Sequence, residues 1–295
     1  MLMRPAVAAT TGALLGMSAL ILSASPSHAA PQRADKTEPP TTVAHRGASG
    51  HAPENTLAAV DKARKLGISW VENDVQRTKD GKLVVMHDTT LDRTTNAEKV
   101  FPDRSPWNVS DFTAKEIAKL DAGSWFSESY QNQKVPTLDQ YLDRVTRNGQ
   151  KLLMELKAPE LYPGIEAQVL KELTKKGWLD GRHLKSKLVV QSFNADSVKK
   201  IHGLKPALKT GFLGNPPKNE LKTYAGFADQ INPKYTTVSK EYVDAIHSVK
   251  GPHGKPLETY AWTVNDAATA RKVADAGVDG IISNYPDVVR QETGG

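Results

Sequence analysis

Residues 42–76 read TVAHRGASGHAPENTLAAVDKARKLGISWVENDVQ, and they contain one complete unit of the fold. A strand pattern begins this stretch and another ends it, while an amphipathic helix pattern fills the middle. Asn55 or Thr56 can cap the helix at its start, and Gly67 follows its end, where a left-handed residue is favoured. A strand, a helix and a second strand in this order predict a parallel βαβ unit.

The same alternation continues to the C-terminus. Several of the strand patterns are nearly continuous apolar runs, as expected when helices cover both faces of a strand. We therefore predict an α/β protein folded as a TIM (β/α)₈ barrel. The predicted strands are 42–45, 70–76, 83–87, 151–156, 188–192, 209–212, 228–231, 258–263 and 280–283, and the predicted helices are 56–66, 138–146, 165–175, 195–201, 240–250 and 266–276.

Two features interrupt the plain repeat. Residues 79–81 (KDG) form a turn signal, so the second strand and the run at 83–87 are predicted to pair as a hairpin. The long segment 88–136 then precedes the next helix, and it carries Trp107, Trp125 and Phe126. Connections of this length are unusual in a compact domain, so we predict a small functional insertion after the hairpin.

The N-terminus has the pattern of a secretory signal peptide. Arg4 supplies a positive charge, residues 6–22 carry none, and small residues precede a cleavage site near Ala29. We predict a signal peptide at 1–29, a flexible tether at 30–40, a catalytic domain at 41–295, and a secreted mature protein. The alternative is a retained anchor, but the apolar run is shorter than the roughly 20 residues that a membrane span needs, so no stable membrane insertion is expected.

Composition excludes several classes of site. The chain has no cysteine, which rules out disulfides, a thiol nucleophile and a cysteine-ligated zinc ion. Lys and Arg number 39 against 33 Asp and Glu, a formal net charge of +6, yet no dense basic block is present. We therefore expect no nucleic-acid partner.

Polar residues gather at the ends of the predicted strands, which converge on one mouth in a parallel barrel. Glu72 and Asp74 lie two apart on one strand, so both carboxylates can face one site. Two such groups with no cation between them repel each other, whereas Ca²⁺ and Mg²⁺ prefer carboxylate oxygens. Glu155 on another strand can complete a metal site; a solvated strand end with incidental acids is the alternative.

Histidines and cations accompany these acids. His45 and His87 each end an early strand, and imidazole suits proton transfer to and from the oxygens of a phosphodiester. Arg46 offers a planar fork to phosphate oxygens, and Lys157 can direct its ammonium group toward the same phosphate. Each has a simpler alternative: a structural histidine, a salt bridge at the rim for Arg46, or a local ion pair between Glu155 and Lys157.

The ordered motifs resemble those of the glycerophosphodiester phosphodiesterase family from about residue 41 to the C-terminus. Each motif is short, but the ordered set is specific. The motifs are HRG at 45–47, PENT at 53–56, ENDV at 72–75, HD at 87–88 with TLDRTT at 90–95, PTL at 136–138, ELK at 155–157, QSF at 191–193, WTVN at 262–265 and VDGIISNYP at 278–286.

This resemblance implies hydrolysis of a small-molecule phosphodiester with one Ca²⁺ or Mg²⁺. Two positions depart from the family pattern: Asn284 stands where an acid is usual, and the polar Asn73 should point away from the site. The implied site residues are the metal ligands Glu72, Asp74 and Glu155, the acid/base pair His45 and His87, the phosphate-binding Arg46 and Lys157, and Trp262 in the wall of the substrate pocket.

Two other functions remain open. A lysophospholipase D or sphingomyelinase D-like enzyme would act on lysophospholipids, and it would need an apolar groove that the insertion at 88–136 can supply. A non-catalytic extracellular binding protein would keep the barrel but lose a histidine or a metal carboxylate, and none is missing here.

Overall fold

The computed structural model describes residues 38–294. The predicted signal peptide at 1–29 and most of the tether at 30–40 lie outside the described residues, so these parts of the domain organisation stay predictions. Within the described residues, no helix is both long enough and apolar enough to cross a membrane.

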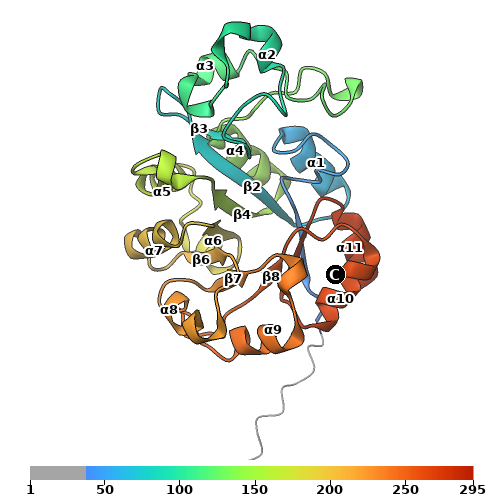
Figure 1. Cartoon of the computed structure of the whole chain (residues 1–295), viewed down its shortest axis with the longest axis vertical. Coiled ribbons are helices and arrows are strands. Elements are labelled where there is room, and N and C mark those ends of the chain that lie inside the picture. The colour runs from blue at the N-terminus through green and yellow to red at the C-terminus, as the bar shows by residue number, and fades with distance from the viewer. Residues whose placement is uncertain (1–37, 295) are drawn as a thin grey trace, which may run out of the picture. The chain divides into compact units, whose positions relative to one another are not determined.

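Eight parallel strands within residues 38–294 form the predicted barrel, with helices around its outside (Figure 1). Hydrogen-bonded neighbours run in the order β7-β6-β5-β4-β2-β1-β9-β8, and parallel bridges from Gln230 to Glu258 and from Lys234 to Trp262 join β7 to β8. The strands are β1 (Thr41–Ala44), β2 (Trp70–Arg77), β4 (Lys151–Leu156), β5 (Leu188–Ser192), β6 (Lys209–Leu213), β7 (Gln230–Asn232), β8 (Tyr260–Ala261) and β9 (Gly280–Ser283).

At least one helix follows each parallel strand, which confirms the predicted fold class. The sequence patterns identified most of these helices but missed α2, α3, α6, α8 and α11, which are short or lie at the end of the chain. The helices are α1 (Leu57–Lys65), α2 (Ala97–Val100), α3 (Ala114–Ile117), α4 (Leu138–Asn148), α5 (Ile165–Lys175), α6 (Gly181–Ser186), α7 (Ala195–Leu204), α8 (Leu221–Tyr224), α9 (Lys240–His247), α10 (Ala267–Asp275) and α11 (Pro286–Thr293).

The strand expected at 258–263 is shorter than predicted, because side chains replace part of its backbone ladder. The backbone N–H of Tyr260 donates to the side-chain oxygen of Asn232 at 3.0 Å. The hydroxyl of Thr259 donates to the carbonyl of Ile231 at 2.7 Å. The barrel closes here through these mixed contacts, and only Tyr260–Ala261 remains a regular strand.

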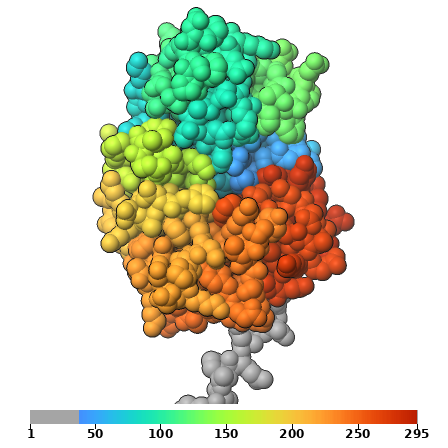
Figure 2. Space-filling view, in the orientation of Figure 1, coloured from blue at the N-terminus to red at the C-terminus, as the bar shows by residue number. Residues whose placement is uncertain are grey.

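The expected hairpin is present: β3 (Leu83–Val85) pairs antiparallel with β2. The insertion that follows carries α2 and α3 and forms the teal to green lobe in Figures 1 and 2. It has a core of its own, in which Phe112 and Leu120 are fully buried and Trp107 packs at the edge. The indole N–H of Trp107 donates to the carbonyl of Phe101 at 2.8 Å, so this ring serves the packing of the insertion.

Alternation along the strands decides which side chains enter the barrel. Val71 and Val75 of β2 belong to the large core cluster that also contains residues of α1, α4 and α5, so Glu72 and Asp74 face the opposite side, the interior. Asn73 shares the outer face, as expected, and its buried amide has no hydrogen-bond partner among the described residues. The interior below the carboxylates is apolar and contains Val43, Leu153, Val189, Tyr260 and Ile282.

Candidate active site

Three carboxylates form the centre of the site at the C-terminal ends of β2 and β4. Asp74 and Glu155 are direct neighbours across the two parallel strands, and Glu72 lies two residues before Asp74. One oxygen of each carboxylate lies within 4.8 Å of the others. All three side chains are buried, with Glu155 the most exposed at 6%.

The electrostatics of this cluster are unfavourable without a cation. Burial, together with repulsion from Asp74 and Glu155, raises the pKa of Glu72 well above its usual range. Burial and the charge of Asp74 raise the pKa of Glu155 to about 8. For Asp74 burial opposes ionisation, but the guanidinium of Arg46 and other nearby cations outweigh it and lower its pKa.

These residues fit a divalent metal ion. Glu72 Oε1 and Asp74 Oδ1 are buried and accept no hydrogen bond from the described residues. Their second oxygens are used: Glu72 Oε2 accepts from the backbone N–H of Arg46 at 2.7 Å, and Asp74 Oδ2 accepts from Asn55 at 2.8 Å. Three carboxylates whose oxygens lie within 4.8 Å of one another, two of them with an oxygen that accepts no hydrogen bond, provide the kind of donor that Ca²⁺ and Mg²⁺ prefer.

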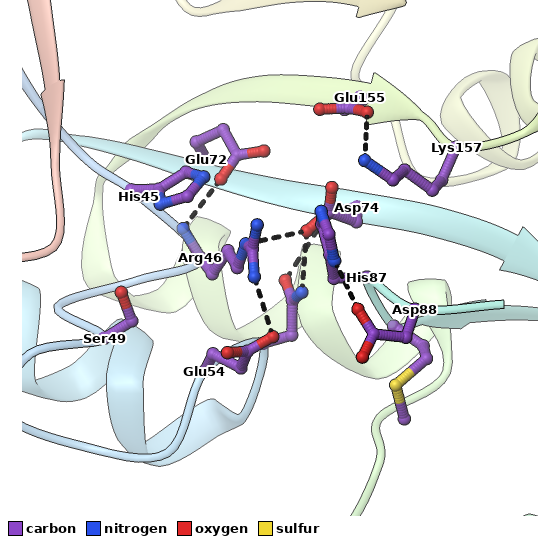
Figure 3. A network of polar contacts seen from close by, with 12 residues as sticks. His45, Arg46, Ser49, Glu54, Glu72, Asp74, His87, Asp88, Glu155 and Lys157 are labelled. Atoms are coloured by element: carbon purple, nitrogen blue, oxygen red, sulfur yellow. Dashed lines mark hydrogen bonds and ion pairs between the residues drawn. The ribbon is translucent and has the colours of Figure 1, made fainter. Parts of the chain in front are cut away.

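The loop after β1 is shaped to bring Arg46 against these acids. Arg46 and Gly47 both have left-handed backbone angles, and a Cβ atom at position 47 would lie 2.6 Å from the backbone of Ala59, so glycine is required there. The guanidinium of Arg46 donates to Glu54 at 2.9 Å and lies 3.5 Å from Asp74 (Figure 3).

His45 is held by an amide. Its Nδ1 lies 2.6 Å from the side-chain oxygen of Asn284, and because an amide oxygen only accepts, Nδ1 carries the proton. Ser49 donates to the same oxygen at 3.0 Å, which fixes the orientation of Asn284. Burial, with the charge of Arg46 adding to it, lowers the pKa of His45 to about 4.

His87 is held by a carboxylate instead. Its Nδ1 lies 2.6 Å from Asp88 Oδ1 (Figure 3). Burial lowers the pKa of His87, although the charge of Asp74 opposes the change. Burial works against ionisation of Asp88 as well, but hydrogen bonds from Arg93 and His87 lower its pKa to about 2, so Asp88 stays an anion beside the imidazole.

A chain of ion pairs links the two halves of this site. Arg93, from the insertion, donates to Glu54 at 2.7 and 3.0 Å. It also donates to both oxygens of Asp88, at 3.1 Å to Oδ1. Since Glu54 contacts Arg46 and Asp88 contacts His87, one guanidinium supports both a candidate phosphate ligand and a candidate acid/base group.

The candidate residues surround a pocket of about 410 Å³. Lys157 lines the pocket and donates to Glu155 at 3.0 Å, and Trp262 forms part of an apolar wall with Phe193. Asp74 belongs to the carboxylate cluster and does not line the pocket. None of the lining residues comes from the insertion at 88–136; they are His45, Arg46, Glu72, His87, Glu155, Lys157, Gln191, Phe193, Leu213, Trp262, Thr263 and Ile282.

Sequence reasoning identified every charged group in the pocket but not the residues that orient them. Asn284 departs from the family pattern, and nothing in the sequence predicts its contact with His45, which lies 239 positions away. Glu54 and Arg93 lie within the family motifs, but their spacing predicts no contact between them. Asp88, directly after His87, was the one partner with a usable signal, because a neighbouring residue at a strand end can reach the imidazole.

Known proteins share this architecture over most of the chain. A 40% identical relative, "Glycerophosphodiester phosphodiesterase" of Bacillus subtilis, aligns over 84% of each chain. A second relative with the same name, from Caldanaerobacter subterraneus, is 34% identical over 84% of this chain and 95% of its own. Among solved structures, an Oleispira antarctica phosphodiesterase in complex with the product sn-glycerol-3-phosphate is 29% identical, with a TM-score of 0.70, over 87% of this chain and 98% of that one.

The fold and these relatives define the class: a hydrolase of phosphoric diesters built on a (β/α)₈ barrel. The model of the glycerophosphoryl diester phosphodiesterase family matches residues 45–288. The chain belongs to this family, which confirms the predicted family, fold and enzyme class.

The carboxylate cluster predicts a pH-dependent instability of the metal-free protein. The pKa of Glu155 is about 8 in the folded state, against an ordinary value of 4.5. Between these pH values the folded protein holds a proton that the unfolded chain has released, so the free energy of unfolding falls as the pH rises. In EDTA, we expect Glu155→Gln to be more stable than wild type at pH 8 by on the order of 1–3 kcal/mol.

Urea unfolding at pH 4.5 and pH 8 measures this difference. At pH 4.5 the difference between Glu155→Gln and wild type should nearly vanish. Glu98→Gln, which removes an exposed carboxylate of the insertion, is the control and should behave like wild type at both pH values. A Glu155→Gln protein that is less stable than wild type at pH 8 would contradict this account of the cluster.

Proposed function

We propose that this protein hydrolyses glycerophosphodiesters, such as glycerophosphocholine or glycerophosphoethanolamine, to glycerol phosphate and an alcohol. The observation that carries the proposal is the convergence, in one pocket, of a carboxylate cluster that fits a metal ion with two oriented histidines. The named activity of the Bacillus subtilis relative and the glycerol phosphate in the Oleispira antarctica complex support the same substrate class.

His45 and His87 would act as the general acid/base pair. One imidazole accepts the proton of the glycerol 2-hydroxyl, whose oxygen forms the new bond to phosphorus, while the other gives a proton to the departing alcohol oxygen. The products of this step are a cyclic glycerol phosphodiester and the free alcohol. Water then opens the ring, with the proton transfers reversed. The Nδ1 contacts of both imidazoles leave each Nε2 available for these transfers.

Charge on the phosphate would be balanced by cations of this chain. Arg46 and Lys157 carry donors that suit phosphoryl oxygens, and both line the pocket. Glu72, Asp74 and Glu155 would hold one Ca²⁺ or Mg²⁺. When bound, such an ion supplies stabilisation of the charge that develops on the phosphoryl oxygens. The anionic substrate also favours the protonated form of whichever imidazole it contacts.

His87→Ala tests the acid/base role. We expect turnover to fall by roughly 10²–10⁴-fold, because the alcohol or the hydroxyl loses its partner for proton transfer. Steady-state kinetics with glycerophosphocholine measures the loss. His202→Ala, on α7 and outside the pocket, is the matched control and should keep normal turnover. Near-normal activity of His87→Ala would remove His87 from the mechanism.

Removal of divalent cations tests the carboxylate cluster. EDTA should abolish activity, and Ca²⁺ or Mg²⁺ should restore it. Independently of activity, a cation at 100 times its Kd should stabilise wild type by about 2.7 kcal/mol, seen as a rise in Tm. Glu72→Gln should lose most of this rise while remaining folded in EDTA. Activity indifferent to chelation, together with an unchanged Tm, would exclude the metal site.

A substrate panel separates this proposal from the lysolipid alternative. That alternative requires an apolar groove from the insertion, yet the insertion contributes no residue to the lining of the pocket. Trp125, the most exposed ring of the insertion at 40%, does not line the pocket, and its indole N–H donates to the carbonyl of Ala122 within the insertion. In steady-state assays of the two substrates side by side, wild type should therefore hydrolyse glycerophosphocholine faster than lysophosphatidylcholine, and the reverse order would favour the lysolipid enzyme.

We also propose that the chain is exported and cleaved near Ala29. The support is the charge at Arg4, the uncharged residues 6–22 and the small residues before the site. When a secreting bacterial host expresses the full chain, mass spectrometry of the medium should find a mature protein that begins at or close to Ala30. Retention of the uncleaved chain in the cytoplasm would contradict the proposal.

A further inference from the structure

A second groove adjoins the reaction pocket. We call it the outer groove; it lies at the ends of β4 and β5 and has a volume of about 650 Å³, which includes space open to solvent. It shares Glu155, Lys157 and Phe193 with the reaction pocket, so a substituent on a bound phosphate can extend into it. The remaining lining residues are Leu156, Ala158, Pro159, Glu160, Ser192 and Asn194.

An aromatic ring forms the border between the pocket and the groove. Phe193 follows β5 and is 48% exposed. It is nevertheless held in place, because its ring contacts Trp262 edge-to-face at a centroid distance of 5.3 Å. Trp262 in turn donates to the carbonyl of Asn232 at 2.8 Å. A fixed, exposed ring of this kind is a surface that attracts cations.

A carboxylate lies on the outer side of the same groove. Glu160 is exposed, within the short turn Pro159–Leu161 that follows β4. The side-chain amide of Asn194 donates to it at 3.4 Å, while the amide oxygen of Asn194 caps α7 by accepting from Ser197 at 3.0 Å. The helix cap therefore orients the group that holds Glu160.

Charges in the groove do not cancel. The ammonium group of Lys157 lies 5.3 Å from the Phe193 ring centroid, but it is paired with Glu155 at 3.0 Å. Glu160 therefore gives the lining of the groove one net negative charge. A cation beside Phe193 would be repelled by Lys157 and attracted by Glu160, so Glu160 is the residue that makes a cationic occupant favourable.

We propose that the outer groove binds the cationic head group of the leaving alcohol. The ligand class is an amino-alcohol ester, with a primary or quaternary ammonium about two carbons from the phosphate. Phe193 and Glu160 are the specificity-determining residues, because both attract a cation. Esters of neutral polyols gain no such attraction from either residue. The inference rests on the proposed function, since it assumes that the phosphate sits in the reaction pocket.

Kinetics on three esters tests the proposal: glycerophosphocholine, glycerophosphoethanolamine and the neutral glycerophosphoglycerol. Glu160→Gln should lower kcat/KM for the two cationic esters about 3- to 5-fold, and Phe193→Leu about 2- to 5-fold. Glu160→Lys should lower it further, by roughly 10-fold, because it adds repulsion. For the neutral ester the two Glu160 variants should stay within about 2-fold of wild type, the range of ordinary surface substitutions, and Phe193→Leu, which also alters the reaction pocket, should lose less than it does on the cationic esters.

The matched control is Glu98→Gln, which removes an exposed carboxylate outside both cavities and should leave all three esters unchanged. An equal loss on the cationic and neutral esters would overturn the proposal, because Glu160 would then support the fold or the shared glycerol end. No loss on any ester would overturn it as well.

Binding of choline chloride separates this inference from the proposed function. Saturation-transfer NMR should show choline bound to wild type and weakened in Glu160→Lys. If wild type hydrolyses none of the three esters, the proposed function fails, and a choline signal that still depends on Glu160 supports the groove. A choline signal equal in both proteins overturns the groove whatever the activity.

Discussion

Mutual repulsion among three buried carboxylates is the constraint on which the rest of the site depends. The register of β2 and β4 places Asp74 directly beside Glu155, and alternation brings Glu72 to the same interior. Neighbouring parallel strands lie about 4.8 Å apart, so the charges cannot separate unless the barrel opens. The loop after β1, with left-handed backbone angles at Arg46 and Gly47, places the backbone N–H and the guanidinium of Arg46 beside these acids and so reduces their repulsion. The remaining free oxygens are suited to a divalent cation.

The two histidines beside this cluster are supported in different ways. An amide oxygen of Asn284 holds His45, whereas the carboxylate of Asp88 holds His87. A carboxylate stabilises an imidazolium more strongly than an amide does, so the two imidazoles are not equivalent even before a substrate arrives. The difference comes from the fold: Asn284 follows β9 and Asp88 follows the hairpin formed with β2, and β9 and β2 flank β1 on opposite sides.

Much of this arrangement could be predicted from periodicity and spacing. Residues two apart on a strand share a face, which placed Glu72 with Asp74, and strand ends converge in a parallel barrel, which placed His45 and Lys157 near them. Contacts that depend on loop conformation could not be predicted. Glu54 and Arg93 are 39 positions apart, and the conformations of the loop after β1 and of the insertion together bring them into contact. Side chains of Thr259 and Asn232 likewise shortened a strand whose pattern looked regular.

The insertion has its own buried centre yet is tied to the barrel mouth through Arg93. It is joined to the rest of the barrel at further points, since Tyr130 donates to the carbonyl of His51 at 2.9 Å and the backbone N–H of Ala114 donates to Asp80 at 2.9 Å. Among these contacts, the guanidinium of Arg93 is the one that bridges Glu54 and Asp88, the partners of Arg46 and His87. An engineer who transplants another lobe onto this barrel has to carry that one side chain along, or rebuild the mouth around its absence.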